Sequence, residues 1–273
     1  MSDKEKTETP DYGSMAGEGF ENQTMADIKI PFLGILQALS PELSPKNAKF
    51  LKDAKAGDLF NTVTGEFWDG DEGIVIQPCD TSHKCVEWRP RTAGGGLVDI
   101  HETDDPIVEA AKRDRELRKS AGPQDEKEAR KLKTPAGTEL VDTFYIYAHL
   151  LTEANGEIIS PIVVSCSSTK ITPYRMLMSR LRTIKFRPPL FAFQIRVKTK
   201  EETNSQNQPY HNFKFEAAID NNLMQSLIPP ADPQQLLEEG ATLMLQQRQG
   251  LLAGRIDAAA AATSDTEATP EAF

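Results

Sequence analysis

Two long stretches rich in β-branched and aromatic residues constrain the fold of this chain most strongly. Residues 56–91 contain the run GIVIQPCDTSHKCVEW, and residues 142–168 contain DTFYIYAHL and EIISPIVVS, which are separated by Asn155-Gly156. Such runs are typical of strands, and Asn-Gly between two of them is typical of a tight hairpin turn. A second pair of runs, LFAFQIRVKTK and YHNFKFEAAI, lies on either side of a polar loop at residues 201–209.

The order of these segments predicts a mainly β domain of the α+β class. Strands follow strands here, without the regular alternation with helices that builds a doubly wound α/β sheet. We therefore expect an antiparallel OB-like barrel, closed or half-open, with helical additions. In the run DTFYIYAHL, alternation places Phe144, Ile146 and Ala148 on one face and Tyr145 and Tyr147 on the other.

Composition divides the chain into four parts. Residues 1–25 predict a disordered, acidic leader, and residues 26–228 hold the OB-like domain with a charged helical excursion at about 105–134. Residues 229–256 predict an amphipathic helix, and residues 257–273 predict a disordered acidic tail. No apolar run approaches the ~20 residues that span a bilayer, and the N-terminus lacks the features of a signal peptide. We therefore expect a cytoplasmic protein with no membrane partner.

Positive charge is concentrated in the middle of an acidic chain. The formal net charge is −10, yet residues 158–200 contain nine lysines and arginines and no carboxylate. Because burying an unpaired charge is unfavourable, we expect most of these side chains to face solvent or a ligand. Residues 1–30 and 229–273, by contrast, are acidic. The nine basic residues are Lys170, Arg175, Arg180, Arg182, Lys185, Arg187, Arg196, Lys198 and Lys200.

Aromatic residues lie among these cations and suggest a ligand for them. A groove that binds single-stranded nucleic acid combines cations that contact phosphates with flat rings that stack on bases. The alternative is a solvated basic face over a core in which Phe191, Phe193, Phe213 and Phe215 are buried. The nucleic-acid hypothesis assigns phosphate contacts to the nine cations, adds Lys84, Arg89 and Arg91 to the same groove, and assigns stacking to Trp88, Tyr174, Phe186 and Tyr210.

The C-terminal sequence SDTEATPEAF is acidic and ends in an aromatic residue. Such a tail can place a terminal phenylalanine in a hydrophobic pocket of a partner, while its acids meet basic residues there. It can also lie across the basic region of its own chain, or it can be a terminus without a role. The residues that we assign to partner binding are Asp265, Glu267, Glu271 and Phe273.

No arrangement of residues in the sequence predicts catalysis. Cys79, His83 and Cys85 would need a fourth zinc ligand from His101 or Cys166, and a tighter Cys-x-x-Cys pair is missing. The Gly94–Gly96 run lacks the strand, helix and GK[ST] ending of a phosphate-binding loop. We therefore predict a protein that is not an enzyme and has no catalytic residues, metal or cofactor.

Several segments resemble phage-encoded proteins of similar length. The segments are ENQTMADIKIPFLGILQALSPEL, AKAGDLFNTVTGE and CVEWRPRTAGGGLVDIH, and some of these phage proteins are described as single-stranded DNA-binding proteins. The tail ending in Phe273 is similar to the tails of phage and bacterial single-stranded DNA-binding proteins, although it has fewer acids. This resemblance implies an OB barrel that coats DNA without sequence preference. It also implies a tail that recruits replication, recombination or transcription proteins.

Two other functions fit the same features. A single-strand annealing recombination protein would also bind single strands, but would pair complementary ones. A non-enzymatic virion or host-interaction protein would use the basic face to bind an acidic protein. Whichever function holds, a homo-oligomer is a further assembly that we consider for this chain.

Overall fold

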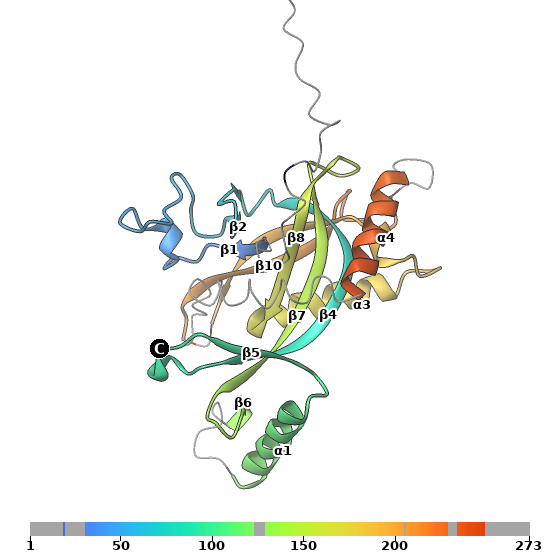
Figure 1. Cartoon of the computed structure of the whole chain (residues 1–273). Helices are drawn as coiled ribbons and strands as arrows, with labels where there is room; N and C mark the ends of the chain where they lie inside the picture. The colour runs from blue at the N-terminus through green and yellow to red at the C-terminus, as the bar shows by residue number, and fades with distance from the viewer. Residues whose placement is uncertain (1–18, 20–30, 123–128, 205, 229–233, 249–273) are drawn as a thin grey trace, which may run out of the picture.

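A curled, ten-stranded sheet forms the centre of the part of the chain that the structure describes, which comprises residues 19, 31–122, 129–204, 206–228 and 234–248 of a computed structural model. The main path of the sheet runs β10-β9-β4-β7-β8-β1-β2-β3, with β5 paired to β4 and β6 to β7 (Figure 1). The strands are β1 Phe32–Ile35, β2 Leu59–Asn61, β3 Phe67–Trp68, β4 Ile74–Trp88, β5 Leu97–Glu102, β6 Leu132–Lys133, β7 Glu139–Leu151, β8 Ile158–Ser167, β9 Ile195–Thr203 and β10 Pro209–Ala217.

The sheet is mixed, which corrects the prediction of a purely antiparallel barrel. β1 runs parallel to β8, where Phe32 pairs with Val163 and Leu33 with Val164, and all four residues of β1 are buried. More than a hundred residues separate these two strands, so no hairpin turn fixes their relative direction. The mainly β, α+β class is confirmed, whereas the OB type of barrel is not confirmed by this strand order.

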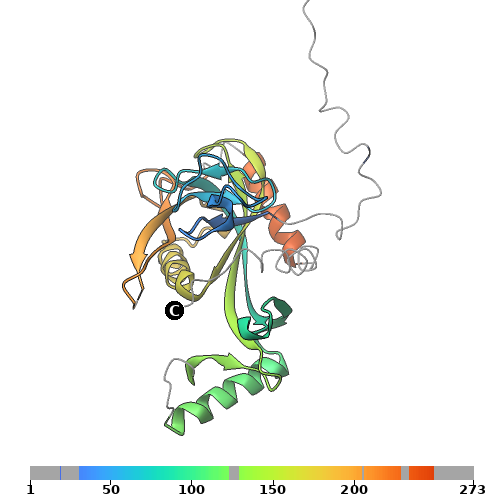
Figure 2. The same cartoon turned by 90° about the vertical axis from the view of Figure 1, so that its left-hand side faces the viewer.

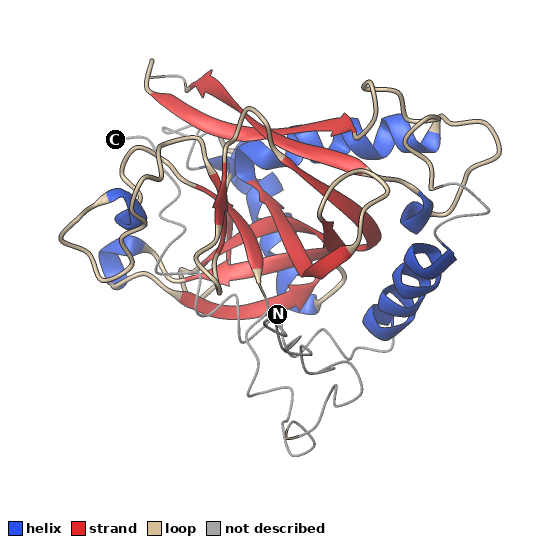
Figure 3. Cartoon of the chain, turned by 90° about the horizontal axis from the view of Figure 1, so that it is seen from above, coloured by secondary structure: helices blue, strands red, loops and turns tan. Residues whose placement is uncertain are grey.

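The predicted hairpins are present. β7 and β8 pair around a turn in which Asn155 adopts a left-handed backbone with φ 58°, and β9 and β10 pair along nine residues. Alternation in β7 is also as predicted, because Ile146 and Ala148 belong to one core cluster while Tyr145 and Tyr147 belong to another. The sheet therefore buries apolar side chains on both of its faces. Figure 3 shows the curled strands with helices lying around them.

Three α-helices cover the sheet and its extension within the described residues: α1 Pro106–Ser120, α3 Ile171–Arg182 and α4 Gln234–Arg248. α3 packs on the first core cluster through Tyr174, Leu177 and Leu181. α4 lies on the opposite face, where Leu243 contacts the second cluster and Leu236 a third. α4 lies inside residues 229–256, for which the sequence predicted an amphipathic helix.

Gly240 allows α4 to approach the sheet closely. A Cβ atom at Gly240 would lie 2.6 Å from Nε2 of Gln77 and 2.9 Å from Cβ of Phe191. Nε2 of the buried Gln77 donates to the carbonyl oxygen of Leu236 at 2.6 Å and to that of Phe191 at 2.8 Å. The absence of a side chain at Gly240 therefore lets α4 lie directly against Gln77 of β4 and against Phe191.

Side chains close the seam of the curled sheet beside β10. Nε2 of Gln37 donates to the carbonyl oxygen of His211, and the amide nitrogen of His211 donates to Oε1 of Gln37, both at 2.9 Å. Farther along the same strand, Nη1 of Arg180 lies 3.4 Å from the carbonyl oxygen of Phe215. These bonds satisfy backbone groups at an edge that would otherwise be open to another strand.

β4 and β7 extend beyond the body of the molecule and form an arm (Figure 2). The arm comprises the far ends of these strands together with β5, β6 and α1, and α1 lies within residues 105–134, where the sequence predicted a charged helical excursion. Its small core contains Cys85, Val108, Ala111, Leu132 and Leu140.

A buried ion pair links two strands of the arm. Nε2 of His101 lies 2.7 Å from Oε2 of Glu87, and Nδ1 lies 3.5 Å from Oδ2 of Asp105. Burial alone would lower the pKa of His101, but the hydrogen bond with Glu87 and the neighbouring carboxylates outweigh it and raise that pKa above 6.5.

Candidate nucleic-acid interface

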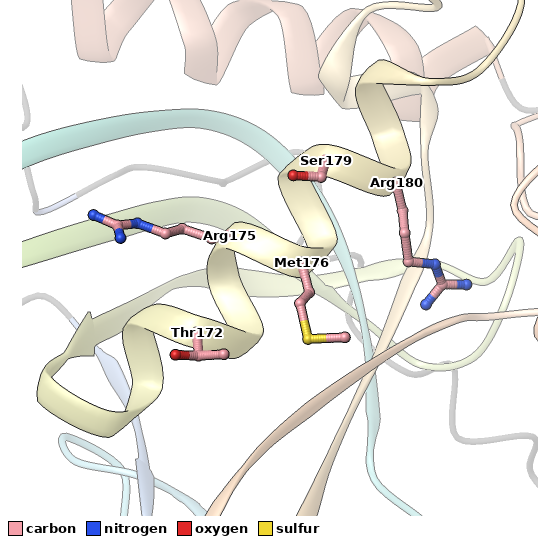
Figure 4. Close-up of a pocket in the computed structure, with 5 residues that line it drawn as sticks. All are labelled: Thr172, Arg175, Met176, Ser179 and Arg180. Atoms are coloured by element: carbon pink, nitrogen blue, oxygen red, sulfur yellow. The ribbon is translucent and has the colours of Figure 1, made fainter.

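α3 presents a basic face to solvent because its apolar residues point to the sheet. Tyr174, Leu177 and Leu181 recur at helical spacing and are buried, so the intervening residues are directed outward. Figure 4 shows Arg175 and Arg180 extending from the helix in different directions, with Met176 between them. The residues that line this shallow hollow are Thr172, Arg175, Met176, Ser179 and Arg180.

Five cations on α3 and the loop after it have no carboxylate partner among the described residues. Arg180 donates only to neutral acceptors, the carbonyl oxygen of Phe215 and Oδ1 of Asn221, each at 3.4 Å. The positive charge of this surface is therefore not neutralised by the parts of the fold that are described. We call it the α3 surface, and its cations are Arg175, Arg180, Arg182, Lys185 and Arg187.

Phe186 protrudes from the loop that follows α3. Its side chain is 83% exposed, and Nζ of Lys185 lies 5.3 Å from the centre of its ring. Phe186 and Arg187 both adopt positive φ angles, of 72° and 43°, which side chains with a Cβ rarely do. Such backbone strain costs on the order of 1–3 kcal/mol per residue and is most common at functional sites.

The cations of β9 behave differently, and the predicted groove must be corrected there. Nζ of Lys198 lies 3.7 Å from Oε2 of Glu216, and Lys200 pairs with Glu202. The hydrogen bond from Lys214 and the charges of Lys214 and Lys198 lower the pKa of Glu216, which keeps it ionised. These lysines therefore already face carboxylates.

Two other predicted cations are also engaged. Lys84 pairs with Glu102 of β5, so it too is neutralised. The guanidinium of Arg196 is 3.5 Å from the carbonyl oxygen of Glu72. For the cations of β9, the sequence signal that could have predicted a nearby carboxylate is Glu216. The register of the β9–β10 hairpin places Glu216 opposite Arg196.

The remaining predicted cations lie outside the α3 surface or at its margin. Nζ of Lys170 lies 5.2 Å from the centre of the Phe213 ring, just before α3. Arg89 is exposed on the arm. Arg91 begins a short 3-10 helix, Arg91–Ala93, and its side chain lies outside the description.

One of the four predicted stacking residues is buried, and two others are half-buried. Tyr174 is 7% exposed and packs in the core, where burial raises its pKa, so its assignment to base stacking is wrong. The hydroxyl of the half-buried Tyr210 donates to Oε2 of Glu202 at 2.7 Å, and burial together with this bond raises its pKa to about 12. Trp88 is half-buried against the second core cluster. Among these four residues, Phe186 is the exposed one, at 83%.

An aromatic stack that sequence reasoning missed connects α3 to the arm. The rings of Phe144 and Tyr174 have their centres 4.7 Å apart, and the ring of His83 lies 4.0 Å from Phe144 at an interplanar angle of 13°. Cζ of Arg175 is 5.7 Å from the centre of Phe144. The sequence suggested His83 only as a possible metal ligand.

The cysteines beside His83 have buried thiols. Cys79 and Cys85 are fully buried in different clusters, and burial raises the pKa of each to about 12. Both thiols are therefore protonated at neutral pH and are poor nucleophiles.

Comparison with protein families places the chain in a phage family. A model of the family described as Pam3 phage gp34-like protein matches residues 3–250. The chain belongs to this family. The predicted phage origin of this gp34-like protein is thereby confirmed. Searches of curated proteins and of solved structures gave no match.

Two further findings concern this gp34-like chain. None of its described helices is long and apolar enough to cross a membrane. The predicted leader at 1–25 lies almost entirely outside the described residues, and the predicted tail at 257–273, with Asp265, Glu267, Glu271 and Phe273, lies wholly outside them.

Proposed function

We propose that this phage protein binds single-stranded DNA through the α3 surface, without preference for base sequence. The observation that carries this proposal is the concentration of five cations, without carboxylate partners in the described structure, beside an exposed phenylalanine. Cations that follow phosphates and a ring that stacks on a base are the two components of single-strand binding.

The exposed ring of Phe186 favours a single strand over a duplex. In a duplex the bases already stack on one another, and inserting a side chain requires unstacking energy. In a single strand a base is free to turn toward the ring, and the neighbouring Lys185 and Arg187 are placed for the flanking phosphates. Met176, which is 63% exposed, adds an apolar contact on α3.

The biological role that we propose is the coating of exposed strands during phage replication or recombination. The acidic sequence that ends in Phe273 would then recruit replication, recombination or transcription proteins. Removal of the last ten residues should not weaken DNA binding, because these residues are acidic and repel phosphates. Clear weakening would contradict the role assigned to the tail.

Binding of a fluorescently labelled thymidine oligonucleotide at low salt tests the proposal. The triple variant Arg182→Gln, Lys185→Gln, Arg187→Gln should lose most of the affinity. The matched control is Lys198→Gln, Lys200→Gln, Lys214→Gln, which removes the same number of charges from the carboxylate-paired strands and should bind nearly as the wild type does.

Three outcomes would contradict the proposal. The first is absence of binding by the wild type, which is the result expected of a virion or host-interaction protein. The second is an equal loss of affinity in the two triple variants. The third is equal affinity for a duplex of the same length. Rapid pairing of complementary strands by the wild type would instead assign the protein to the annealing class.

A further inference from the structure

We propose that the bound strand continues from α3 onto the arm, where the ring of His83 stacks on one unpaired base. This inference rests on the proposed function and adds a subsite to it. The subsite is formed by β4, β7 and the beginning of α3, which come together only in the folded chain.

The stack leads outward from the core in three steps. Tyr174 is buried and fixed by the packing of α3, and Phe144 is half-buried with one ring on each side. His83 is the outermost member, and its side chain is 38% exposed. Phe144 covers one face of the His83 ring, no other described ring stacks on it, and we place the base on the remaining exposed part.

The ring of His83 is already held in place before a ligand arrives. His83 and Phe144 are direct cross-strand partners of β4 and β7, which aligns their side chains. Nε2 of His83 also lies 2.9 Å from Oδ1 of Asp142, which fixes the rotation of the ring. A ring that is held in this way loses little conformational entropy when a base stacks on it.

Arg175 connects this subsite to the α3 surface. Its guanidinium lies beside Phe144, and it belongs to the N-terminal half of α3, whereas Phe186 follows the C-terminal end. A helix of 12 residues is about 18 Å long, so the two exposed rings, His83 and Phe186, stand near opposite ends of α3. A single strand laid along α3 would meet a ring at each end.

Two oligonucleotides of equal charge test the subsite: a thymidine strand, and an abasic strand of the same length, which keeps the phosphates but has no bases. His83→Ala should weaken binding of the thymidine strand about fivefold or more and leave binding of the abasic strand unchanged. His83→Phe should keep the wild-type ratio of the two affinities, because it retains a flat ring at the end of the stack.

The outcomes separate this inference from the proposed function. If the wild type binds neither strand, both fail. If the wild type binds and His83→Ala leaves the affinity ratio unchanged, the subsite is refuted and the α3 surface stands. If His83→Ala weakens both strands equally, or if His83→Phe behaves as His83→Ala does, the stack only braces the arm and the inference is overturned.

Discussion

The salt dependence of DNA binding measures how many cations of this protein meet phosphates. Each phosphate contact on a single strand contributes about −0.7 to the slope of log affinity against log salt. With one phosphate for each of the five cations of the α3 surface, we expect a slope of about −3.5. Affinity should then fall about 100-fold between roughly 50 and 200 mM salt.

The salt slope distinguishes binding through the α3 surface alone from binding that also uses the paired lysines of β9. If all nine cations of residues 158–200 met phosphates, the slope would be about −6 and the loss over the same range several thousandfold. Lys198 and Lys200 already lie beside Glu216 and Glu202, so transferring them to phosphates would remove Lys200 from Glu202 and one of two neighbouring lysines from Glu216. The structure therefore predicts the smaller slope.

Fluorescence anisotropy titrations of a labelled thymidine oligonucleotide at several salt concentrations give the slope directly. Substituting one cation of the α3 surface, as in Arg182→Gln or Lys185→Gln, should reduce its magnitude by about 0.7. Lys200→Gln is the matched control and should leave the slope unchanged. A wild-type slope near −6, or a Lys200→Gln variant that changes the slope as much as Arg182→Gln does, would refute the reasoning.

Three further predictions concern the loop, the fold and the arm. Phe186→Gly should weaken DNA binding about fivefold or more, as equilibrium titration measures. Urea denaturation should show a free energy of unfolding that is unchanged or raised by up to about 1 kcal/mol, because glycine relieves a positive φ. A large loss of stability would contradict the assignment of Phe186 as a DNA-binding residue. Gly240→Ala should lower the free energy of unfolding by about 1–3 kcal/mol despite the better helix propensity of alanine, because its Cβ would lie 2.6 Å from Gln77. An increase in the free energy of unfolding, measured by urea denaturation, would show that α4 can shift freely. Because Glu87 and its neighbours raise the pKa of His101, the contribution of this ion pair to the free energy of unfolding should be fully present below about pH 6.5 and be lost as the pH rises through the raised pKa. Denaturation of His101→Asn at several pH values should lack this loss. An unchanged pH profile would rule out His101 as its source.

Local pattern predicted much of the fold. The alternation in β7 depends only on the side-chain period of a strand, and the turn at Asn155-Gly156 depends on the tolerance of these two residues for a left-handed backbone. In each case the residues that decide the structure are neighbours in the chain.

The candidate site was predicted less completely, because exposure and pairing depend on distant segments. Tyr174 belongs to a basic segment in the sequence, but helical spacing turns it with Leu177 and Leu181 toward the sheet. Lys200 seems unpaired when only residues 158–200 are counted, yet Glu202 is two positions away. His83 showed no signal as a stacking residue, because its partner Phe144 is sixty-one residues later in the chain.

The sequence by itself determined a mainly β protein with a positively charged centre and acidic flanking segments, since strand propensity, helical spacing and charge are properties of short segments. Only the tertiary structure decided that β1 lies parallel to β8, that the lysines of β9 face carboxylates, and that His83, Phe144 and Tyr174 form one stack. The physical reason is that strand pairing and the burial of side chains are settled by contacts between segments far apart in the chain. The sequence pattern specifies which faces must be covered, but it does not specify which segment covers them.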